Sequence, residues 1–321
     1  MKTFGRCLGC YGSIEGDAIY HPRCSRALFG SDAPPELPYD LEGLKKLAAK
    51  NVLESVAVPG VQTKLSMDRE TTKDGGRLTI VGLRGAYILK PPSSEYPYLP
   101  ENEDLTMSLA RLAGIDVAPH GLLPLASGEL AYVTRRPDRT IARGRKIVPL
   151  VRHMEDFCQI TEHLTEHKYR GSMEQVARTI RTYSSYAGND LARLLDLLVF
   201  VFLTGNADMH LKNFSLLYDG ESRSLAPAYD LLSTRLAIPE SVDPEELALP
   251  LNGKKSRLHP DDFVAFLKSA GLTETQFART LRRFSSKMER LLAFIGEGFL
   301  PEAMVRDYRN LVRDRAARLG I

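Results

Sequence analysis

The spacing of apolar residues changes about midway along the chain. Before residue 134 they fall mainly in short or alternating runs, which are typical of strands, whereas after Met154 they recur at helical intervals. The strands predicted in the first part are Val61–Met67, Leu78–Leu83, Ala86–Leu89 and Ala131–Thr134, and the helices there are Glu42–Ala49 and Asn102–Ala113. The helices predicted in the second part are Met173–Ser184, Asp190–Gly205, Pro260–Ala270, Glu274–Ile295 and Pro301–Leu319.

This order of elements predicts an α+β fold in which a small β-rich lobe precedes a larger helical lobe. Bilobal protein-kinase-like enzymes have this layout, although layout alone does not establish function. The predicted domains are 1–38, a Cys/His segment with a linker, then 39–134, the small lobe, and 135–321, the helical lobe. The linker is Ser31–Pro38, because its three prolines oppose both helix and central strand.

Composition narrows the class of protein. With 321 residues, of which 43% are hydrophobic, the chain can bury one large core or two moderate ones. The longest apolar run, Leu197–Leu203, is far shorter than the roughly 20 residues of a membrane span, and the N-terminus has no apolar signal region. We therefore expect a cytoplasmic protein with reduced thiols and no membrane partner.

Charge gives no reason to expect direct binding of nucleic acid. The net charge is only +3, and the one cluster of basic residues singled out lies near the C-terminus. The arginines in that cluster are Arg306, Arg309, Arg313, Arg315 and Arg318. They alternate with apolar residues such as Leu311 and Val312, which predicts a solvent-exposed face of an amphipathic helix.

The first 24 residues contain a candidate metal site. Cys7, Cys10, His21 and Cys24 form two close pairs of ligands, and four such ligands can surround one zinc ion tetrahedrally. The alternative is a reduced, metal-free turn. Because the segment precedes the linker, we expect the activity of the remaining chain not to depend on it. Cys158, in an apolar context, is interpreted as an inert core thiol.

The strongest candidate for chemistry is GNADMHLKN at 205–213, a polar loop directly after a strongly apolar helix. Asp208 and Asn213 are five positions apart, and Asp230 follows in AYDLLS. Phosphoryl transfer needs a carboxylate at the attacking hydroxyl, here Asp208, and oxygen ligands for Mg²⁺, here Asn213 and Asp230. Because Asn and Asp are also ordinary turn residues, a purely structural loop is the alternative for this motif taken alone.

A second candidate group lies upstream of this loop. Lys90 ends the apolar strand that begins near Tyr87, where a kinase holds the phosphates of ATP. A carboxylate must orient such a lysine, and Glu101 or Glu103 at the start of the next predicted helix can do so. Both glutamates could also serve simply as partners of the helix dipole.

Three further features complete the predicted nucleotide site. In VPGVQTKLS, the turn at Pro59 and Gly60, followed by Val61 and Gln62, could lay backbone N–H groups over phosphate. The crossing to the helical lobe begins at Arg135. Asp138 could accept a ribose hydroxyl or pair with a neighbouring arginine.

Taken in order, nine motifs resemble the HipA family of bacterial serine/threonine kinases, in particular its short, HipT-like members. The motifs are VPGVQTKL, YILKP, ENE, RRPDR, HMEDFCQ, KYRG, GNADMHLKNFSL, APAYDLL and ALPLNGK, and the similarity covers roughly residues 50 to 320. The resemblance implies an ATP- and Mg²⁺-dependent kinase with Asp208 as catalytic residue, Asn213 and Asp230 as metal ligands and Lys90 on phosphate. His210 would donate to the transferring phosphoryl group or only pack the loop.

The resemblance also implies partners. The substrates described for the family are aminoacyl-tRNA synthetases, whose phosphorylation arrests translation and growth. A HipB-like DNA-binding antitoxin is expected as a partner. The chain lacks the N-terminal subdomain of the longer members, so a separate HipS-like small protein is expected as well.

One departure from the family pattern concerns control. Family members phosphorylate themselves on a serine in the phosphate loop, where this chain has Ala57, with Ser55 two places earlier. Alanine cannot accept the phosphate, so either this control is absent or it has moved to Ser55. We expect the first, with restraint coming from protein partners.

Two other functions stay open at this point. A small-molecule kinase shares the same spacing of Asp208 and Asn213. A non-catalytic partner of a transcriptional repressor would belong to a different class, but the presence of Lys90, Asp208, Asn213 and Asp230 together disfavours it.

Overall fold

The computed structural model describes residues 4–54, 63–70, 76–81, 85–141 and 149–321. The chain forms two compact units, each discontinuous in sequence. The first consists of Met1–Asp104 and Ala118–Val151, and the second of Leu105–Val117 and Arg152–Ile321. None of the helices in the described ranges is long and apolar enough to cross a membrane.

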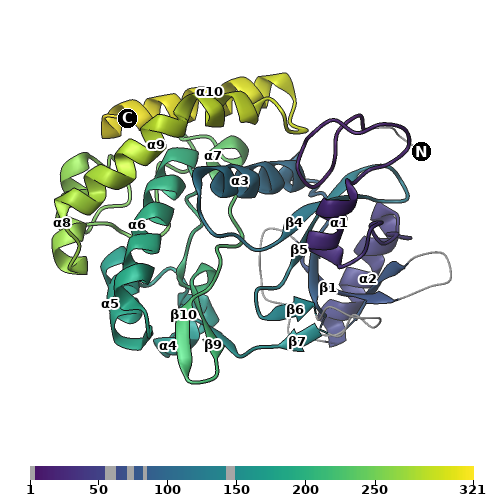
Figure 1. Ribbon diagram of the computed structural model, residues 1–321, viewed down its shortest axis with the longest axis horizontal. Helices are drawn as coiled ribbons and strands as arrows, with labels where there is room; N and C mark the ends of the chain where they lie inside the picture. Colours follow the sequence, from purple (N-terminus) through teal and green to yellow (C-terminus); the bar gives the residue numbers. More distant parts are fainter. Residues whose placement is uncertain (1–3, 55–62, 71–75, 82–84, 142–148) are drawn as a thin grey trace. The chain divides into compact units, whose positions relative to one another are not determined.

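A five-stranded antiparallel sheet forms the centre of the first unit (Figure 1). Its strands, in spatial order, are β2 (Arg77–Ile80), β1 (Leu65–Glu70), β3 (Tyr87–Lys90), β5 (Leu130–Arg135) and β4 (His120–Pro124). The pairing of β3 with β5 sets Lys90 opposite Tyr132. A separate pair, β6 (Arg139–Ile141) and β7 (Pro149–Val151), lies at the end of the unit's sequence. β4 was not predicted from the apolar pattern.

Three helices accompany this sheet: α1 (Pro22–Phe29), α2 (Leu41–Glu54) and the start of α3 (Leu99–Ala113). The sequence did not predict α1, which begins with Pro22 and ends at Gly30 in the left-handed conformation (φ 75°). It packs against β5 (Figure 1). The Cys/His segment is therefore part of the first unit and not a separate appendage.

The stretch Ser31–Pro38 does not behave as a free linker. Glu36 forms a parallel bridge with Arg77 of β2, and Leu37 is buried. The backbone N–H of Leu78 donates to the carbonyl of Glu36 (2.8 Å). The prolines do oppose regular structure, but the residues between them add to the sheet edge.

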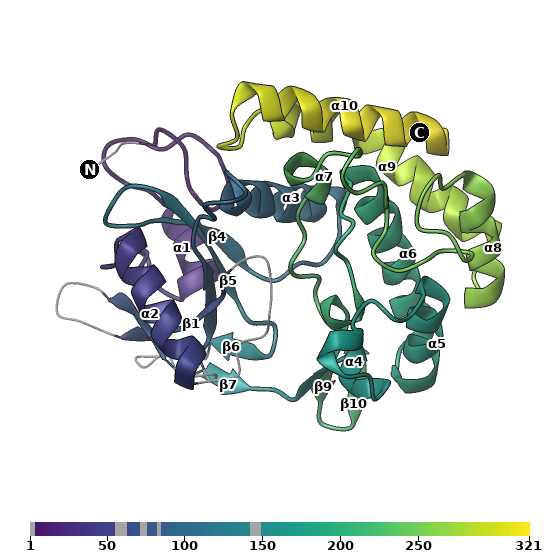
Figure 2. The same cartoon turned by 180° about the vertical axis from the view of Figure 1, so that it is seen from behind.

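The second unit is mainly helical (Figure 2). Its helices are α4 (Phe157–Ile160), α5 (Met173–Tyr183), α6 (Ala187–Thr204), α7 (Thr234–Ala237), α8 (Pro260–Ala270), α9 (Glu274–Ile295) and α10 (Glu302–Leu319). Its 3₁₀ turns are η1 (Thr165–His167) and η2 (Leu211–Asn213), and the strands β8 (Met154–Asp156), β9 (Ser215–Asp219) and β10 (Ser222–Leu225) form a small sheet. The strongly apolar α6 packs against α5, α9 and α10, and thereby forms the centre of this unit.

The predicted α+β fold is confirmed, with an antiparallel sheet in one unit and helices in the other. One prediction about α10 is wrong. Arg315 is buried rather than exposed, with its guanidinium 4.7 Å from the centre of the Phe202 ring and 3.4 Å from Glu246. A helix face with this alternation can bury an arginine when a carboxylate and an aromatic ring receive it.

Candidate functional site

The first unit contains a buried ion pair between Lys90 and Glu103. Lys90 Nζ donates to Glu103 Oε1 (2.6 Å) and Oε2 (2.7 Å), and both side chains are almost fully buried. Of the two glutamates named from the sequence, the partner of Lys90 is Glu103, while Glu101 lies in the first turn of α3. The lysine therefore has the orienting carboxylate that a phosphate-binding lysine requires.

Local structure explains this geometry. Lys90 is the last residue of β3, and Glu103 lies on the first part of α3, which follows β3 in the chain. The ring of Tyr132, across from Lys90 on β5, has its centre 5.4 Å from the ammonium group. A charged lysine is costly to bury, and a bidentate carboxylate together with an aromatic face offsets that cost.

In the second unit the polar loop begins where α6 ends. Gly205 has the left-handed conformation (φ 65°), and an added Cβ there would lie 2.7 Å from Leu311 and 3.0 Å from Arg235. The side chain of Thr234 then fastens the loop: its hydroxyl donates to the Gly205 carbonyl (3.0 Å) and accepts from the Ala207 N–H (2.8 Å). Tight contacts thus fix the backbone just before Asp208.

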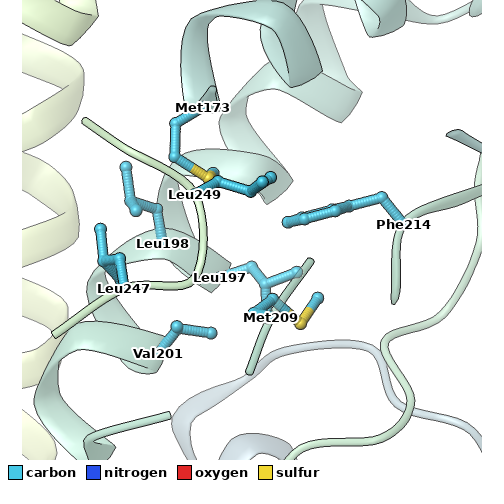
Figure 3. Close-up of a pocket in the computed structure, with 8 residues that line it drawn as sticks. All are labelled: Met173, Leu197, Leu198, Val201, Met209, Phe214, Leu247 and Leu249. Carbon is cyan, nitrogen blue, oxygen red and sulfur yellow. The ribbon is translucent and has the colours of Figure 1, made fainter. Parts of the chain in front are cut away.

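Apolar contacts hold the other side of the loop. Figure 3 shows Met209 and Phe214 pointing towards side chains of α5 and α6 around a small cavity. The cavity of about 10 Å³ is lined by apolar residues: Met173, Leu197, Leu198, Val201, Met209, Phe214, Leu247 and Leu249. It has room for about one water molecule and offers it no polar partner, so it is a packing gap beneath the loop and not a substrate site.

Asn213 and Asp230, the two predicted metal ligands, lie in contact. Asn213 Nδ2 donates to Asp230 Oδ2 (3.1 Å), although the residues are 17 positions apart. Asn213 Oδ1 is buried, and no donor reaches it within the part of the chain that the structure describes. Asp230 has φ 61°, an unfavourable conformation that is often kept at functional sites. An unsatisfied amide oxygen beside a carboxylate fits the oxygen ligands that Mg²⁺ prefers.

Asp208 has a partner that the sequence did not reveal. The hydroxyl of Tyr169 donates to Asp208 Oδ1 (2.5 Å). Burial, and then this hydrogen bond, raises the pKa of Tyr169, so the phenol stays protonated and continues to donate. Tyr169 belongs to the KYRG motif at 168–171, and nothing in that motif alone indicated which residue it would contact.

His210 packs edge-on against Tyr169, with the ring centres 5.1 Å apart. Burial lowers its pKa below the ordinary value, while the charge of Asp208 acts in the opposite direction. The neutral imidazole is therefore favoured in this unit. Whether it donates to a phosphoryl group, as the resemblance suggested, stays a prediction.

Two of the other residues predicted to contact the nucleotide, Arg135 and Asp138, have protein partners in the structure. Arg135 donates to the Ala27 carbonyl of α1 (3.1 Å), and Asp138 accepts hydrogen bonds from both Arg136 (3.0 Å) and Arg139. These contacts account for both residues without a nucleotide, and they favour the arginine-pairing alternative for Asp138. Their nucleotide roles stay predictions. Gly60, Val61 and Gln62, with Ser55 and Ala57, lie outside the described residues.

The four predicted metal ligands of the N-terminal segment come together in the first unit. One ligand atom from each of Cys7, Cys10, His21 and Cys24 lies within 4.8 Å of the others. Burial raises the pKa of Cys10, but hydrogen bonds from Gly12 and His21 outweigh it and bring the pKa down to about 7. Burial and the neighbouring thiols raise the pKa of Cys24 instead, to about 12. The case for a metal site therefore rests on the geometry of the four ligands.

Comparisons with known proteins agree on one family. Residues 56–292 match the family model described as HipA-like C-terminal domain. A Sinorhizobium fredii protein named "Putative kinase Y4dM" is 37% identical over 284 residues, which are 84% of this chain and 64% of that protein. The serine/threonine-protein kinase toxin HipA of Shewanella oneidensis is 27% identical over 258 residues, 74% of this chain and 57% of the toxin.

A solved structure shows the same fold. It is the complex of HipA, HipB and operator DNA from the Shewanella oneidensis toxin–antitoxin system, and HipA superposes with a TM-score of 0.70 at 24% identity. The match covers 83% of this chain and 65% of that one. The chain thus spans less than two thirds of the length of each of these three proteins.

Proposed function

Because the chain belongs to the family of HipA-like C-terminal domains, whose relatives include named kinases, we propose that it is an ATP- and Mg²⁺-dependent protein serine/threonine kinase. The observation that carries this proposal is the contact of Asn213 with Asp230, with a buried amide oxygen left open beside the loop of Asp208. A purely structural turn has no need of such an oxygen, whereas a metal site does.

Each residue receives one role. Lys90, held by Glu103, would contact the phosphates of ATP, and Asn213 and Asp230 would hold the magnesium ion. When bound, Mg²⁺ neutralises negative charge on the phosphates. Asp208 would accept the proton of the attacking hydroxyl, and Tyr169 orients its carboxylate.

The proposed reaction is a displacement at the γ-phosphorus of ATP. The oxygen of a serine or threonine hydroxyl bonds to that phosphorus, and the bond from phosphorus to the bridging oxygen of the leaving group breaks. The hydroxyl proton passes to the Asp208 carboxylate. The products are the phosphorylated protein and ADP.

The family relationship supports a proposal for the substrate and the partners. We assign an aminoacyl-tRNA synthetase as the substrate, so that phosphorylation would arrest translation. A HipB-like antitoxin is the proposed regulatory partner, since a HipA relative is assembled with HipB and operator DNA. A HipS-like small protein is the second.

Phosphoproteomics after induced expression tests the proposal, with Asp208→Ala as the control. We expect serine or threonine phosphorylation of one host synthetase with the unaltered chain and none with the variant. Phosphate on a small molecule but on no protein would instead identify a small-molecule kinase.

A further inference from the structure

The Cys/His cluster has the dimensions of a tetrahedral metal site. Three thiols and one imidazole nitrogen lie within 4.8 Å of one another, and Cys10 Sγ is 3.3 Å from His21 Nδ1. Zinc–sulfur bonds of about 2.3 Å imply sulfur atoms roughly 3.8 Å apart. A small contraction of the cluster would therefore close it around one ion.

The groups around the ligands support the same interpretation. His21 Nε2 lies 3.0 Å from the carbonyl of Ser13, which leaves Nδ1 as the nitrogen that faces the thiols. Metal-binding histidines commonly donate their second nitrogen to a carbonyl in this way. The backbone N–H of His21 in turn donates to Cys7 Sγ (3.3 Å), and this contact holds the ligand atom of Cys7 in place.

The loop that carries two of the ligands is fastened to the sheet. The carbonyl of Leu8, between Cys7 and Cys10, accepts from the Leu122 N–H of β4 (3.0 Å). The hydroxyl of Tyr20, next to His21, donates to the Leu122 carbonyl (2.8 Å). Gly121 permits this approach, because a Cβ at that position would clash with the Tyr20 hydroxyl.

A third contact leads from the cluster to helix α3. Tyr11 follows Cys10 directly, and its hydroxyl donates to Asp104 Oδ2 (2.6 Å). The other carboxylate oxygen of Asp104 lies 2.6 Å from Nδ1 of His120, the first residue of β4. Asp104 is buried, so these two partners satisfy a charge that would otherwise be costly.

Asp104 is the neighbour of Glu103, the partner of Lys90. His120, which also holds Asp104, stacks on Tyr132 with ring centres 6.1 Å apart, and Tyr132 in turn lies over Lys90. The cluster is thus linked to both members of the ion pair through buried side chains of one unit. Displacement of Tyr11 would leave an oxygen of Asp104 without its donor at the position where α3 must present Glu103.

We propose that Cys7, Cys10, His21 and Cys24 bind one structural zinc ion, and that the zinc-bound loop positions the start of α3 so that Glu103 holds Lys90. The zinc site and its effect on α3 stand by themselves; the effect on phosphotransfer rests on the proposed kinase function. Tyr11 is a positioning residue in this arrangement. The proposal replaces the expectation that activity is independent of the N-terminal segment.

Metal content is measured first, on the full chain purified without chelator under reducing conditions. Elemental analysis should find about one zinc per chain, Cys10→Ser should reduce this to nearly none, and Cys158→Ala should leave it unchanged because that buried thiol lies outside the cluster. A stable unaltered chain without zinc, or one with another metal, would overturn the proposal.

Hydrogen exchange then tests the link to α3 without any use of activity. Removal of zinc from the unaltered chain by a chelator should accelerate hydrogen exchange in residues 99–104 and in β4. Exchange in α6 of the second unit should stay unchanged and serves as the control. This arm does not depend on whether Cys10→Ser folds. Zinc removal with unchanged exchange at 99–104 would refute the positioning role.

Tyr11→Phe separates the link from the metal. It removes one hydroxyl, so zinc content should stay near one per chain while exchange at 99–104 rises. If the kinase proposal holds, the KM for ATP should rise roughly tenfold with a smaller change in kcat, since the loss acts through Lys90. The unaltered chain could also bind zinc, and exchange faster at 99–104 after zinc removal, yet transfer no phosphate. That result would support this inference and contradict only the kinase proposal. Unchanged exchange in Tyr11→Phe would contradict the inference.

Discussion

The two groups of charged residues proposed for phosphotransfer differ in their surroundings. Lys90 and Glu103 are 4% and 1% exposed, and their charges are satisfied by each other within a core. Asp208 and Asp230 are partly exposed on loops, and the known partner of Asp208 is the half-exposed Tyr169. The Lys90–Glu103 pair therefore contributes to the fold as well as to the proposed chemistry, whereas the partly exposed Asp208 contributes less to the fold.

The largest effect is expected for Lys90→Met. It removes the ammonium group that compensates the buried Glu103 carboxylate, which costs about 3–5 kcal/mol of folding free energy, and it also removes the proposed phosphate ligand. Denaturant unfolding and ATP-dependent phosphorylation, measured on the same preparation, should both show the loss.

The double variant Lys90→Met with Glu103→Leu is the matched control. Replacement of both charges by apolar side chains should restore most of the lost stability but none of the phosphotransfer. If stability is unaffected by the single change, the pair is not the buried ion pair described above. If phosphotransfer survives in the double variant, the role of Lys90 is refuted.

The next largest effect on activity is expected for Asp208→Ala and Asp230→Ala. Loss of a proton acceptor or a metal ligand should reduce the rate of phosphotransfer by about 10²–10⁴-fold. The unfolding midpoint should change little for Asp208→Ala, because its side chain is partly exposed. Asp219→Ala, an exposed acid at the end of β9, is the control and should keep full activity. Equal activity of the Asp208 and Asp219 variants would contradict the mechanism.

The sequence predicted the helical unit better than the sheet. Pro260–Ala270 and Glu274–Ile295 coincide with α8 and α9, because amphipathic helices repeat their apolar residues within a short span. The strand β4 and the helix α1 were missed. Both are short, with eight residues in α1 and five in β4. In addition, α1 packs on β5, which lies about a hundred residues later in the chain, and periodicity cannot reveal such a contact.

The candidate site shows the same limit. The spacing of Asp208 and Asn213 is local, so the loop could be identified from residues alone. Residues alone could not decide whether Glu101 or Glu103 contacts Lys90, because that depends on how α3 is rotated about its axis next to β3. The contact of Tyr11 with Asp104 joins residues 93 positions apart, and no local pattern indicates it.

Tyr169→Phe should have the smallest effect of these changes. It tests whether the orientation of the Asp208 carboxylate matters for the reaction. The variant keeps the ring that packs on His210 and removes only the hydroxyl that donates to Asp208. We expect kcat to fall roughly three- to tenfold, with the KM for ATP unchanged, because the carboxylate loses its orientation but not its charge.

Since the pKa of Tyr169 is raised, its phenol is protonated throughout the range from pH 6 to 9, and the fold-reduction should be constant across that range. Steady-state kinetics of both proteins at several pH values provide the measurement, with Tyr183→Phe, an exposed tyrosine at the end of α5, as the matched control. A rise in kcat would instead mean that the hydrogen bond from Tyr169 makes Asp208 a poorer proton acceptor, so that Tyr169 inhibits the reaction.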